Sequence, residues 1–412
     1  MKNYLITTRS IQAILFAYPV LLLTVKGGMG TGFILLVALS VYLMFCNASS
    51  GIRQNMDRDL VLFGVSMSAT IISIMLSQFY HLSANARDFD SASRFLFSIP
   101  IFLVLRETDY KVFKPLQYGL AVGAILIGFI IVISGQKMIA STYFLIHIHL
   151  GDLALMLGFL SVFSINWMQK DSHFVVILKV IGLVAGLYVS MVSGARGGWA
   201  AIPIFLLIWI LLSPNFKNGL VIKLIITVAA MIFGSVVGYM TINVVHVRMD
   251  AAIHDLTAVT PDTSLGIRFQ LWKAAVQLFM QNPVFGVGAD GFALAMDRMA
   301  DSGVVTRMAA DIGKGEVHSY YFATLARYGI AGMISLALLF FLPMRMFYKA
   351  SSSQYQFHRV AARMGLCVVL GFLVFCITVE MFNLKMIATF YGMTVAVLLS
   401  AATNRTVGKV AN

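Results

Sequence analysis

The sequence predicts an all-α polytopic membrane protein with about 12 transmembrane helices and one long polar insertion. The chain of 412 residues is 59% hydrophobic and only 11% charged, and its mean hydropathy is +0.87. Apolar runs of about 20 residues, the length of a helix that crosses a bilayer, recur along the chain. A soluble domain of this size cannot bury so much apolar helix surface, so the soluble classes are excluded.

The predicted spans are apolar runs separated by short polar segments. They lie near residues 11–25, 32–46, 59–80, 94–106, 115–134, 150–168, 174–193, 198–213, 220–242, 320–343, 361–380 and 384–403. The first run follows basic residues, as in a secretory signal, but no small-residue cleavage site comes after it. We therefore expect transmembrane helices 1–9 in residues 1–242, the insertion in 243–319, and helices 10–12 with a cytoplasmic tail in 320–412.

The net charge of +13 is distributed unevenly between the two faces of this topology. The face that holds both termini carries Lys2, Arg9, Arg53, Arg58, Arg106, Lys111, Lys114, Lys170, Lys217, Lys223, Arg345, Lys349, Arg359, Arg363, Arg405 and Lys409. The short loops of the other face carry Lys26, Arg87, Arg94, Lys137, Arg196 and Lys385. Basic loops stay in the cytoplasm, so the termini are predicted to be cytoplasmic and the insertion to lie outside the cytoplasm. The charge is topological and predicts no nucleic-acid partner.

The insertion is predicted to contain a helix from Ser264 to Gln281, after a turn that offers Asp262 or Ser264 as the N-cap. Asn282-Pro283 ends this helix. At helical spacing, one of its faces carries Arg268, Trp272, Ala275 and Phe279. Polar residues on the other side indicate that it lies along the membrane surface or caps the bundle.

A tight turn marked by Gly286, Gly288 and Gly291 is expected to follow, before a short second helix over Phe292–Met299.

Three cationic or titratable side chains lie beside hydrophobic spans: Arg196, Arg268 and His318. Charged groups near lipid are costly, so they usually face a cavity or an anionic partner. Two guanidiniums suit a diphosphate, and an imidazole can take a proton from an attacking hydroxyl. Glycines around Arg196 allow backbone N–H groups to approach an anion. Arg268 lies near the start of its helix, where the dipole also favours phosphate.

Each of these residues also has a purely structural interpretation. Arg196 could extend to lipid headgroups, Arg268 could be a solvated helix charge, and His318 could be a hydrogen-bonded structural residue. Other histidines weaken the signal, because His147 and His149 flank an outer loop, and His246 and His254 lie early in the insertion. The residues alone leave these alternatives open.

Three stretches together resemble the O-antigen ligase family and its polymerase relatives. They are SGARGGW at the end of a span, SLGIRFQLWKAAVQLFMQNPVFGVGADGF in the insertion, and HSYYFATLARYGIAG at the next span. The shared pattern is a span-terminal Arg, an Arg with Trp four residues later, a Pro-x-x-Gly-x-Gly turn, and a His followed by a Gly-x-x-Gly helix. These motifs cover about Ser193–Gly332, and the other spans match in number and hydropathy.

The resemblance implies a GT-C-type glycosyltransferase of the bacterial inner membrane. Such enzymes move a glycan from an undecaprenyl-diphosphate carrier to a lipid A–core sugar on the periplasmic side. By resemblance, Arg196 and Arg268 hold the donor diphosphate, and His318 activates the acceptor hydroxyl. Glu380 is the nearest match to an acidic residue of the penultimate span, where relatives can carry Asp. Ser319 stands where many relatives have Asn.

The supporting candidates are Trp272 and Arg87. Arg87, Arg94 and Lys137 are cations that could bind donor or lipid A phosphates, and solvated surface charge is the alternative role of all three. The expected reaction is a direct inverting displacement, in which the two arginines neutralise the leaving diphosphate. We expect no cofactor and no metal, because no outward loop carries an Asp-x-Asp pair and the acids of the insertion are scattered. The partners expected are the lipid-linked donor, the lipid A–core acceptor and membrane lipids.

Three alternatives share parts of this pattern. An O-antigen polymerase or a protein O-oligosaccharyltransferase would use the same donor with another acceptor. A lipid-linked glycan flippase would need charged groups deep within several spans, often on broken helices related by repeats. Most spans here carry no such groups, which favours an enzyme.

Overall fold

The computed structural model describes residues 2–49, 56–136, 139–212 and 260–408, together with 236, 238–241, 243, 245–247 and 249–250. Within these residues the regular structure is helical, apart from one isolated β-bridge between Thr142 and Leu145. The predicted all-α class is therefore confirmed.

The long and short helices follow the chain in this order: α1 (Lys2–Thr24), α2 (Gly28–Ser49), α3 (Arg58–Tyr80), η1 (Ala86–Asp88), α4 (Phe89–Leu96), α5 (Ser98–Glu107), η2 (Tyr110–Phe113), α6 (Lys114–Ile133), α7 (His147–Phe163), α8 (His173–Ser193), α9 (Arg196–Trp199), α10 (Ala201–Leu212), α13 (Ser264–Gln281), α14 (Gly291–Asp301), α15 (Arg307–Gly313), α16 (Tyr320–Ala350), α17 (Gln356–Thr378), η4 (Met381–Asn383) and α18 (Lys385–Ala402).

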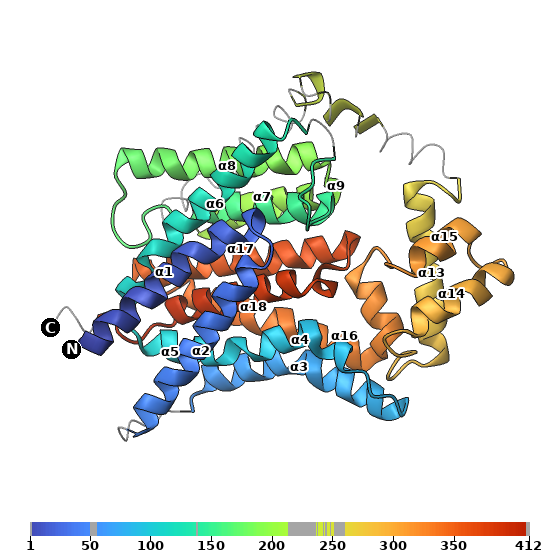
Figure 1. Ribbon diagram of the computed structural model, residues 1–412, viewed down its shortest axis with the longest axis horizontal. Helices are drawn as coiled ribbons and strands as arrows, with labels where there is room; N and C mark the ends of the chain where they lie inside the picture. The colour runs from blue at the N-terminus through green and yellow to red at the C-terminus, as the bar shows by residue number, and fades with distance from the viewer. Residues whose placement is uncertain are drawn as a thin grey trace.

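The helices form a bundle with α17 and α18 in its middle, between α7 and α8 on one side and α3 and α16 on the other (Figure 1). In the most apolar 18-residue stretch of each helix, 83% of the residues are buried in α17 and 89% in α18, but only 33% in α8. A helix that is hydrophobic all round belongs in a core, and α18 meets this expectation. The exposed apolar faces of α3 and α8, such as Phe79 and Phe174, are suited to contact lipid.

Among the described residues, seven helices are long and apolar enough to cross a membrane. They are Gly28–Cys46, Arg58–Tyr80, Tyr110–Ile133, His173–Ser193, Tyr320–Ala350, Gln356–Thr378 and Lys385–Ala402, and the apolar stretches His147–Phe163 and Arg196–Leu212 are shorter. The chain is thus a polytopic membrane protein, but the predicted count of twelve is not confirmed. Most of the predicted span at 220–242 lies outside the described residues.

The predicted single span at 94–106 is wrong, because the structure divides it between α4 and α5. The helices meet at Phe97, and the Ser98 hydroxyl donates to the carbonyl of Phe95 at 2.6 Å. Pro100 stands in the first turn of α5 and has no N–H with which to continue the hydrogen bonding of α4. The ten residues of α5 extend only about 15 Å, half of a bilayer core.

The described part of the insertion has a hydrophobic core of its own. Buried residues of α13, α14 and α15 pack together with Val317 and with Ala323 and Ala326 in the first turns of α16. The unit formed by α13–α15 therefore sits on one end of the bundle, opposite the two termini (Figure 1).

Helix α13 has the predicted bounds but a different N-cap. The Thr263 hydroxyl accepts from the backbone N–H of Gly266 at 3.2 Å, so the prediction of Asp262 or Ser264 is wrong. The most buried face of α13 includes Ile267 and Leu271. Each of these residues precedes by one position a residue of the predicted face, Arg268 and Trp272. The polar side of α13 contacts the start of α15, where the Gln270 amide oxygen accepts from the N–H of Thr306 at 2.6 Å. The second predicted helix is present as α14, slightly longer than expected.

The Pro-x-x-Gly-x-Gly turn docks on a break in α16 at Gly329, where φ is +60° and ψ is −148°. The N–H groups of Val287 and Gly288 donate to the carbonyls of Ala326 and Arg327 at 2.8 and 3.0 Å. In return, the N–H groups of Ile330 and Ala331 donate to the carbonyls of Pro283 and Val284 at 2.8 and 3.1 Å. The turn thus satisfies backbone groups that the break leaves without helical partners.

Replacing Gly329 by alanine is expected to destabilise the protein strongly. The backbone conformation is nearly exclusive to glycine and costs another residue about 1–3 kcal/mol. A Cβ at this position would also lie 2.5 Å from the carbonyl oxygen of Pro283, which is backbone and cannot move away cheaply. Thermal unfolding in detergent should show the loss. Gly30→Ala is the matched control, because a Cβ there meets nothing within 4 Å, and an equal effect of both changes would contradict the expectation.

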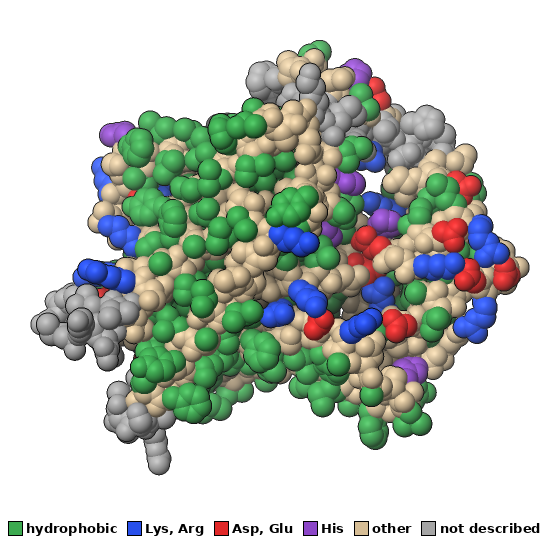
Figure 2. All heavy atoms as spheres, in the orientation of Figure 1, with side chains coloured by type: hydrophobic (Ala, Val, Ile, Leu, Met, Phe, Trp, Pro, Cys, Tyr) green, Lys and Arg blue, Asp and Glu red, His purple; other side chains and the backbone are tan. Residues whose placement is uncertain are grey.

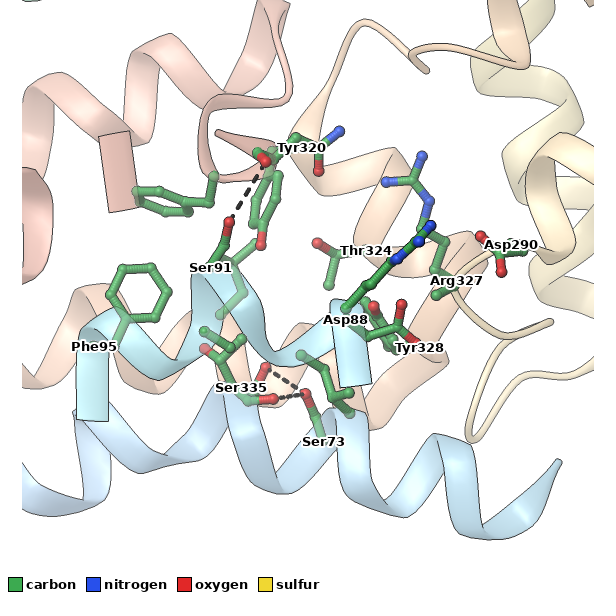
Figure 3. A pocket seen from close by; sticks show the side chains of 18 residues that line it. Ser73, Asp88, Ser91, Phe95, Asp290, Tyr320, Thr324, Arg327, Tyr328 and Ser335 are labelled. Atoms are coloured by element: carbon green, nitrogen blue, oxygen red, sulfur yellow. Dashed lines mark hydrogen bonds between the residues drawn. The ribbon is translucent and has the colours of Figure 1, made fainter. Parts of the chain in front are cut away.

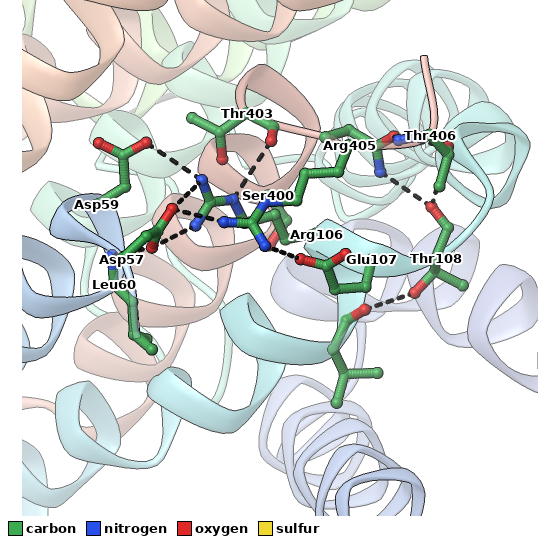
Figure 4. Close-up of polar contacts among 12 residues, drawn as sticks. Asp57, Asp59, Leu60, Arg106, Glu107, Thr108, Ser400, Thr403, Arg405 and Thr406 are labelled. Carbon is green, nitrogen blue, oxygen red and sulfur yellow. Dashed lines mark hydrogen bonds and ion pairs between the residues drawn. The ribbon is translucent and has the colours of Figure 1, made fainter. Parts of the chain in front are cut away.

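The end of the bundle that holds the termini is closed by an ion network (Figure 4). Arg106, at the end of α5, donates to Asp57 at 2.8 Å and to Asp59 at 3.2 Å. Arg405, after α18, donates to Asp57 at 2.7 Å and to Glu107 at 2.8 Å. Several of the basic residues assigned to the cytoplasmic face are thus engaged in structural ion pairs at one end of the molecule.

Candidate functional site

His318 lies where the α13–α15 unit joins α16, and it has a positive φ of 56°. A left-handed backbone is unfavourable for a residue with a side chain, and such strain is typical of functional sites. The two neighbouring residues are held in place. The N–H of Val317 donates to Glu380, and the Ser319 hydroxyl lies 3.5 Å from the carbonyl of Cys376. The surrounding packing therefore fixes the imidazole at this junction.

Glu380 is the centre of a buried polar cluster and is only 1% exposed. Its carboxylate accepts from the N–H of Val317, from the guanidinium of Arg327 and from the amide of Asn383. Its own backbone N–H donates to Glu316 at 2.8 Å. Glu380 thus joins the end of α17 to α16 and to the segment before His318. It holds these elements together, and both of its carboxylate oxygens are used in these contacts.

Arg268 and His318 share one electrostatic environment. Burial lowers the pKa of His318, the Arg268 guanidinium lowers it further, and Glu380 acts in the opposite direction. Burial raises the pKa of Glu316. The hydrogen bond from the Glu380 backbone and the charges of Arg268 and Arg327 lower it in part. The His318 Nδ1 lies 3.8 Å from a Glu316 oxygen, beyond hydrogen-bond distance. Arg268 and His318 are therefore brought together from separate parts of the sequence.

Arg196 begins the short helix α9, two residues after the left-handed Gly194 with φ of +70°. Glycines follow it because α9 packs tightly on its neighbours. A Cβ on Gly197 would lie 2.2 Å from the Thr378 hydroxyl, and one on Gly198 would lie 2.1 Å from an Asp152 oxygen. The close approach that these glycines permit is thus an approach of the chain to α17 and α7.

The last turn of α17 links the two halves of the candidate site. Thr378 contacts the α9 segment that carries Arg196, and Cys376 contacts Ser319, next to His318. Figure 2 shows acidic, basic and histidine side chains over the α13–α15 unit and along the hollowed border between it and the bundle. Hydrophobic side chains dominate the rest of the bundle in that view.

The two supporting candidates lie in different places. Trp272 packs inside the α13–α16 contact, where its ring stacks on Phe322 with centroids 5.0 Å apart. This is a packing role, although its indole nitrogen is buried without a hydrogen-bond partner among the described residues. Arg87 lies in η1 and lines a polar cavity of about 260 Å³. Two other residues of interest from the sequence, Lys137 and His254, lie outside the described residues.

The polar cavity lies between α3, α4 and α16 (Figure 3). Tyr320, Thr324, Arg327 and Asp88 are among its walls, and Arg196, Arg268 and His318 are not among the residues that line it. Arg327 and Asn383 line the cavity and also bind Glu380. The cavity and the segment before His318 are thus connected through Glu380.

Sequence reasoning missed three residues of this region. Arg327 lies within the LARYGIAG part of the third motif. Its charge at membrane depth could have indicated a buried partner such as the predicted Glu380. Glu316 stands only two residues from His318 but was grouped with scattered acids. Asp152, in α7, is fully buried beside Gly198, and neither carboxylate oxygen has a hydrogen-bond partner among the described residues. No spacing in the sequence connects Asp152 with Arg196.

Comparison with known proteins agrees with the motifs. Residues 181–337 match the family model described as O-antigen ligase. The resemblance to the O-antigen ligase family is confirmed over this region. The match covers Arg196, Arg268, His318 and Arg327 and ends before Glu380. The chain is also 27% identical over 275 residues to a protein of Haemophilus influenzae described as uncharacterized, covering 64% of this chain and 67% of that relative.

The matched region joins elements that the fold brings into contact. It begins within α8, includes the α9 turn and the whole α13–α15 unit, and ends within α16.

Proposed function

We propose that this protein is an O-antigen ligase, an inverting and metal-independent glycosyltransferase. It moves a glycan from undecaprenyl diphosphate to a lipid A–core sugar hydroxyl on the periplasmic side of the inner membrane. The observation that carries the proposal is that the partly buried His318 lies next to the α17 turn that also contacts the Arg196 segment, at the end of the bundle remote from the termini. The charge of Arg268 acts on the same imidazole and lowers its pKa.

The chemistry assigned to these residues is one displacement. The acceptor hydroxyl oxygen forms a bond to the anomeric carbon while His318 takes the hydroxyl proton. The bond between that carbon and the phosphate oxygen breaks, and the negative charge that grows on the diphosphate meets Arg196 and Arg268. A neutral imidazole is required, and the lowered pKa of His318 supplies it at neutral pH.

Reconstitution tests the function directly. The purified protein in liposomes receives undecaprenyl-diphosphate glycan and rough lipopolysaccharide, with and without EDTA. Ligated lipopolysaccharide formed in EDTA is the expected product. Longer glycan on the carrier without lipopolysaccharide would identify a polymerase, transfer to a protein would identify an oligosaccharyltransferase, and movement across the bilayer without new glycosidic bonds would identify a flippase.

Alanine at Arg196 or Arg268 is expected to lower the rate of transfer by about 100- to 1,000-fold, the usual effect of removing one group that stabilises a developing negative charge. The initial rate in the reconstituted assay measures it. Arg307→Ala is the control, because Arg307 lies in the same unit but its side chain is 60% exposed and pairs with Asp297 and Asp301 at the surface. An equal loss of transfer rate in the Arg196, Arg268 and Arg307 variants would contradict a role of Arg196 and Arg268 in binding the diphosphate.

A further inference from the structure

One ring nitrogen of His318 has no hydrogen-bond partner in the resting structure. Nδ1 is buried and makes no hydrogen bond to any of the described residues. A buried polar atom without a partner is uncommon in folded proteins, so its surroundings need an explanation. A carboxylate stands close by, because Oε2 of Glu316 lies 3.8 Å from Nδ1. Glu316 is therefore the candidate partner of this nitrogen.

The carboxylate of Glu316 is held in place by its other oxygen. Oε1 accepts from the backbone N–H of Glu380 at 2.8 Å, while Oε2 is the oxygen near the imidazole. The N–H of Val317, between Glu316 and His318, donates to the Glu380 carboxylate. His318 itself has a left-handed φ of 56°, which a residue with a side chain adopts only where its surroundings impose it. The three consecutive residues are thus fixed with the carboxylate beside the ring.

Two arginines and a second carboxylate act on this pair. Burial raises the pKa of Glu316, and the charges of Arg268 and Arg327 limit that rise, so they favour its carboxylate form. Burial and Arg268 lower the pKa of His318, whereas Glu380 acts to raise it, so the imidazole is neutral at neutral pH. A neutral imidazole carries one proton, and the hydrogen bond of one nitrogen decides which nitrogen carries it.

We propose that Glu316 is the positioning residue of His318: its carboxylate accepts the Nδ1–H and leaves Nε2 to take the proton of the acceptor hydroxyl. This inference rests on the proposed function. During transfer the hydroxyl proton moves to Nε2, the Nδ1 proton stays in place, and the positive charge of the imidazolium faces the Glu316 carboxylate. Closing the 3.8 Å separation to a hydrogen bond takes a movement of about 1 Å. Such contacts are often long until the substrate binds.

The tautomer of His318 tests this assignment without any substrate. Nitrogen NMR of the full-length protein in detergent, with isotope-labelled histidines, distinguishes Nδ1–H from Nε2–H imidazoles at a pH where His318 is neutral, and His318→Gln identifies the signal. The unchanged protein is expected to carry the proton on Nδ1. In Glu316→Gln the amide oxygen can accept from the N–H of Glu380 while the NH₂ group donates to Nδ1, so the proton should move to Nε2.

Glu316→Gln is also expected to lower the single-turnover rate of transfer by about 10- to 100-fold, the usual effect of removing the carboxylate that orients a functional imidazole. Loss of a neighbouring carboxylate lowers the pKa of His318, so the fall in the remaining rate should move to lower pH. Asp311→Asn is the matched control, because Asp311 lies in the same unit, its side chain is 63% exposed and it pairs with Lys314. This variant should keep the tautomer, the rate and the pH profile of the unchanged protein.

An Nε2–H tautomer of His318 in the unchanged protein would overturn the proposal, and this result decides even if Glu316→Gln does not fold. The same tautomer in the unchanged protein and in folded Glu316→Gln would also overturn it. Transfer assays separate this inference from the proposed function. If the tautomer changes as expected but the unchanged protein transfers no glycan, the positioning role stands and the ligase assignment fails. If Glu316→Gln transfers glycan at the unchanged rate, the positioning role fails and the ligase assignment stands.

Discussion

His318→Ala is expected to reduce glycan transfer by about 100- to 10,000-fold, the range for loss of a general base. The loss should appear in the rate of the chemical step and leave donor binding nearly unchanged, because the diphosphate is assigned to Arg196 and Arg268. Single-turnover assays with bound donor separate the two effects. Tyr321→Phe is a suitable control nearby, since it removes a hydroxyl that donates to the carbonyl of Leu373 at 2.7 Å.

The pH dependence gives a second test of the same role. Burial and the Arg268 charge lower the pKa of His318 below its ordinary 6.5. A base must be neutral to act, so the rate should be constant at neutral pH and fall only as pH drops through this lowered pKa. Arg268→Gln removes one cause and should raise the pKa. Diethylpyrocarbonate modification of the His318 peptide, followed by mass spectrometry, measures that pKa without any substrate. A reactivity midpoint that Arg268→Gln leaves unmoved would contradict the proximity of these residues.

The fold was predictable from sequence where one local signal decided it. Helix α13 has the expected bounds because a turn of cap-forming residues precedes it and Asn282-Pro283 ends it, although the N-cap is Thr263 and not Asp262 or Ser264. The region at 94–106 was misjudged because hydropathy averages over Pro100, which divides α4 from α5. Hydropathy also cannot distinguish a span from a buried helix, and the 17 residues of α7 are covered on almost all sides by other helices.

The site was predictable in its residue types but not in its connections. Arg268 and His318 were recognisable as charges beside spans, and the structure places them in one environment. Glu380 was expected as an acidic group of the penultimate span, yet its role depends on contacts with Val317 and Arg327, more than 50 residues away. The turn at Gly286 was expected as a tight turn, but the docking of its backbone groups on α16 was not foreseen. Such pairings depend on tertiary packing, which has no local signature.

Glu380→Ala is expected to destabilise the protein by about 3–5 kcal/mol, the usual cost of removing one partner from a buried ion pair. Arg327 would keep its charge at 16% side-chain exposure with no carboxylate beside it, and the N–H of Val317 would lose its acceptor. Unfolding in SDS should show the loss directly. Asp297→Ala is the control, because Asp297 forms its ion pairs with Arg307 and Lys314 at the surface and should affect stability little.

A double variant distinguishes an ion pair from a general packing effect. Removing Arg327 as well as Glu380 leaves no uncompensated charge, so Glu380→Ala/Arg327→Ala should be more stable than the sum of the single losses predicts, by about 1–3 kcal/mol. Strict additivity would contradict a direct interaction. Glu380→Gln keeps an acceptor for the N–H of Val317 but leaves the Arg327 charge without a carboxylate, so it should lose less stability than Glu380→Ala. Because the side chain also fixes the segment before His318, Glu380→Gln should still shift the pH profile of transfer, since Glu380 acts to raise the pKa of His318. The shift is toward lower pH, and a profile identical to that of the unchanged protein would limit Glu380 to a structural role.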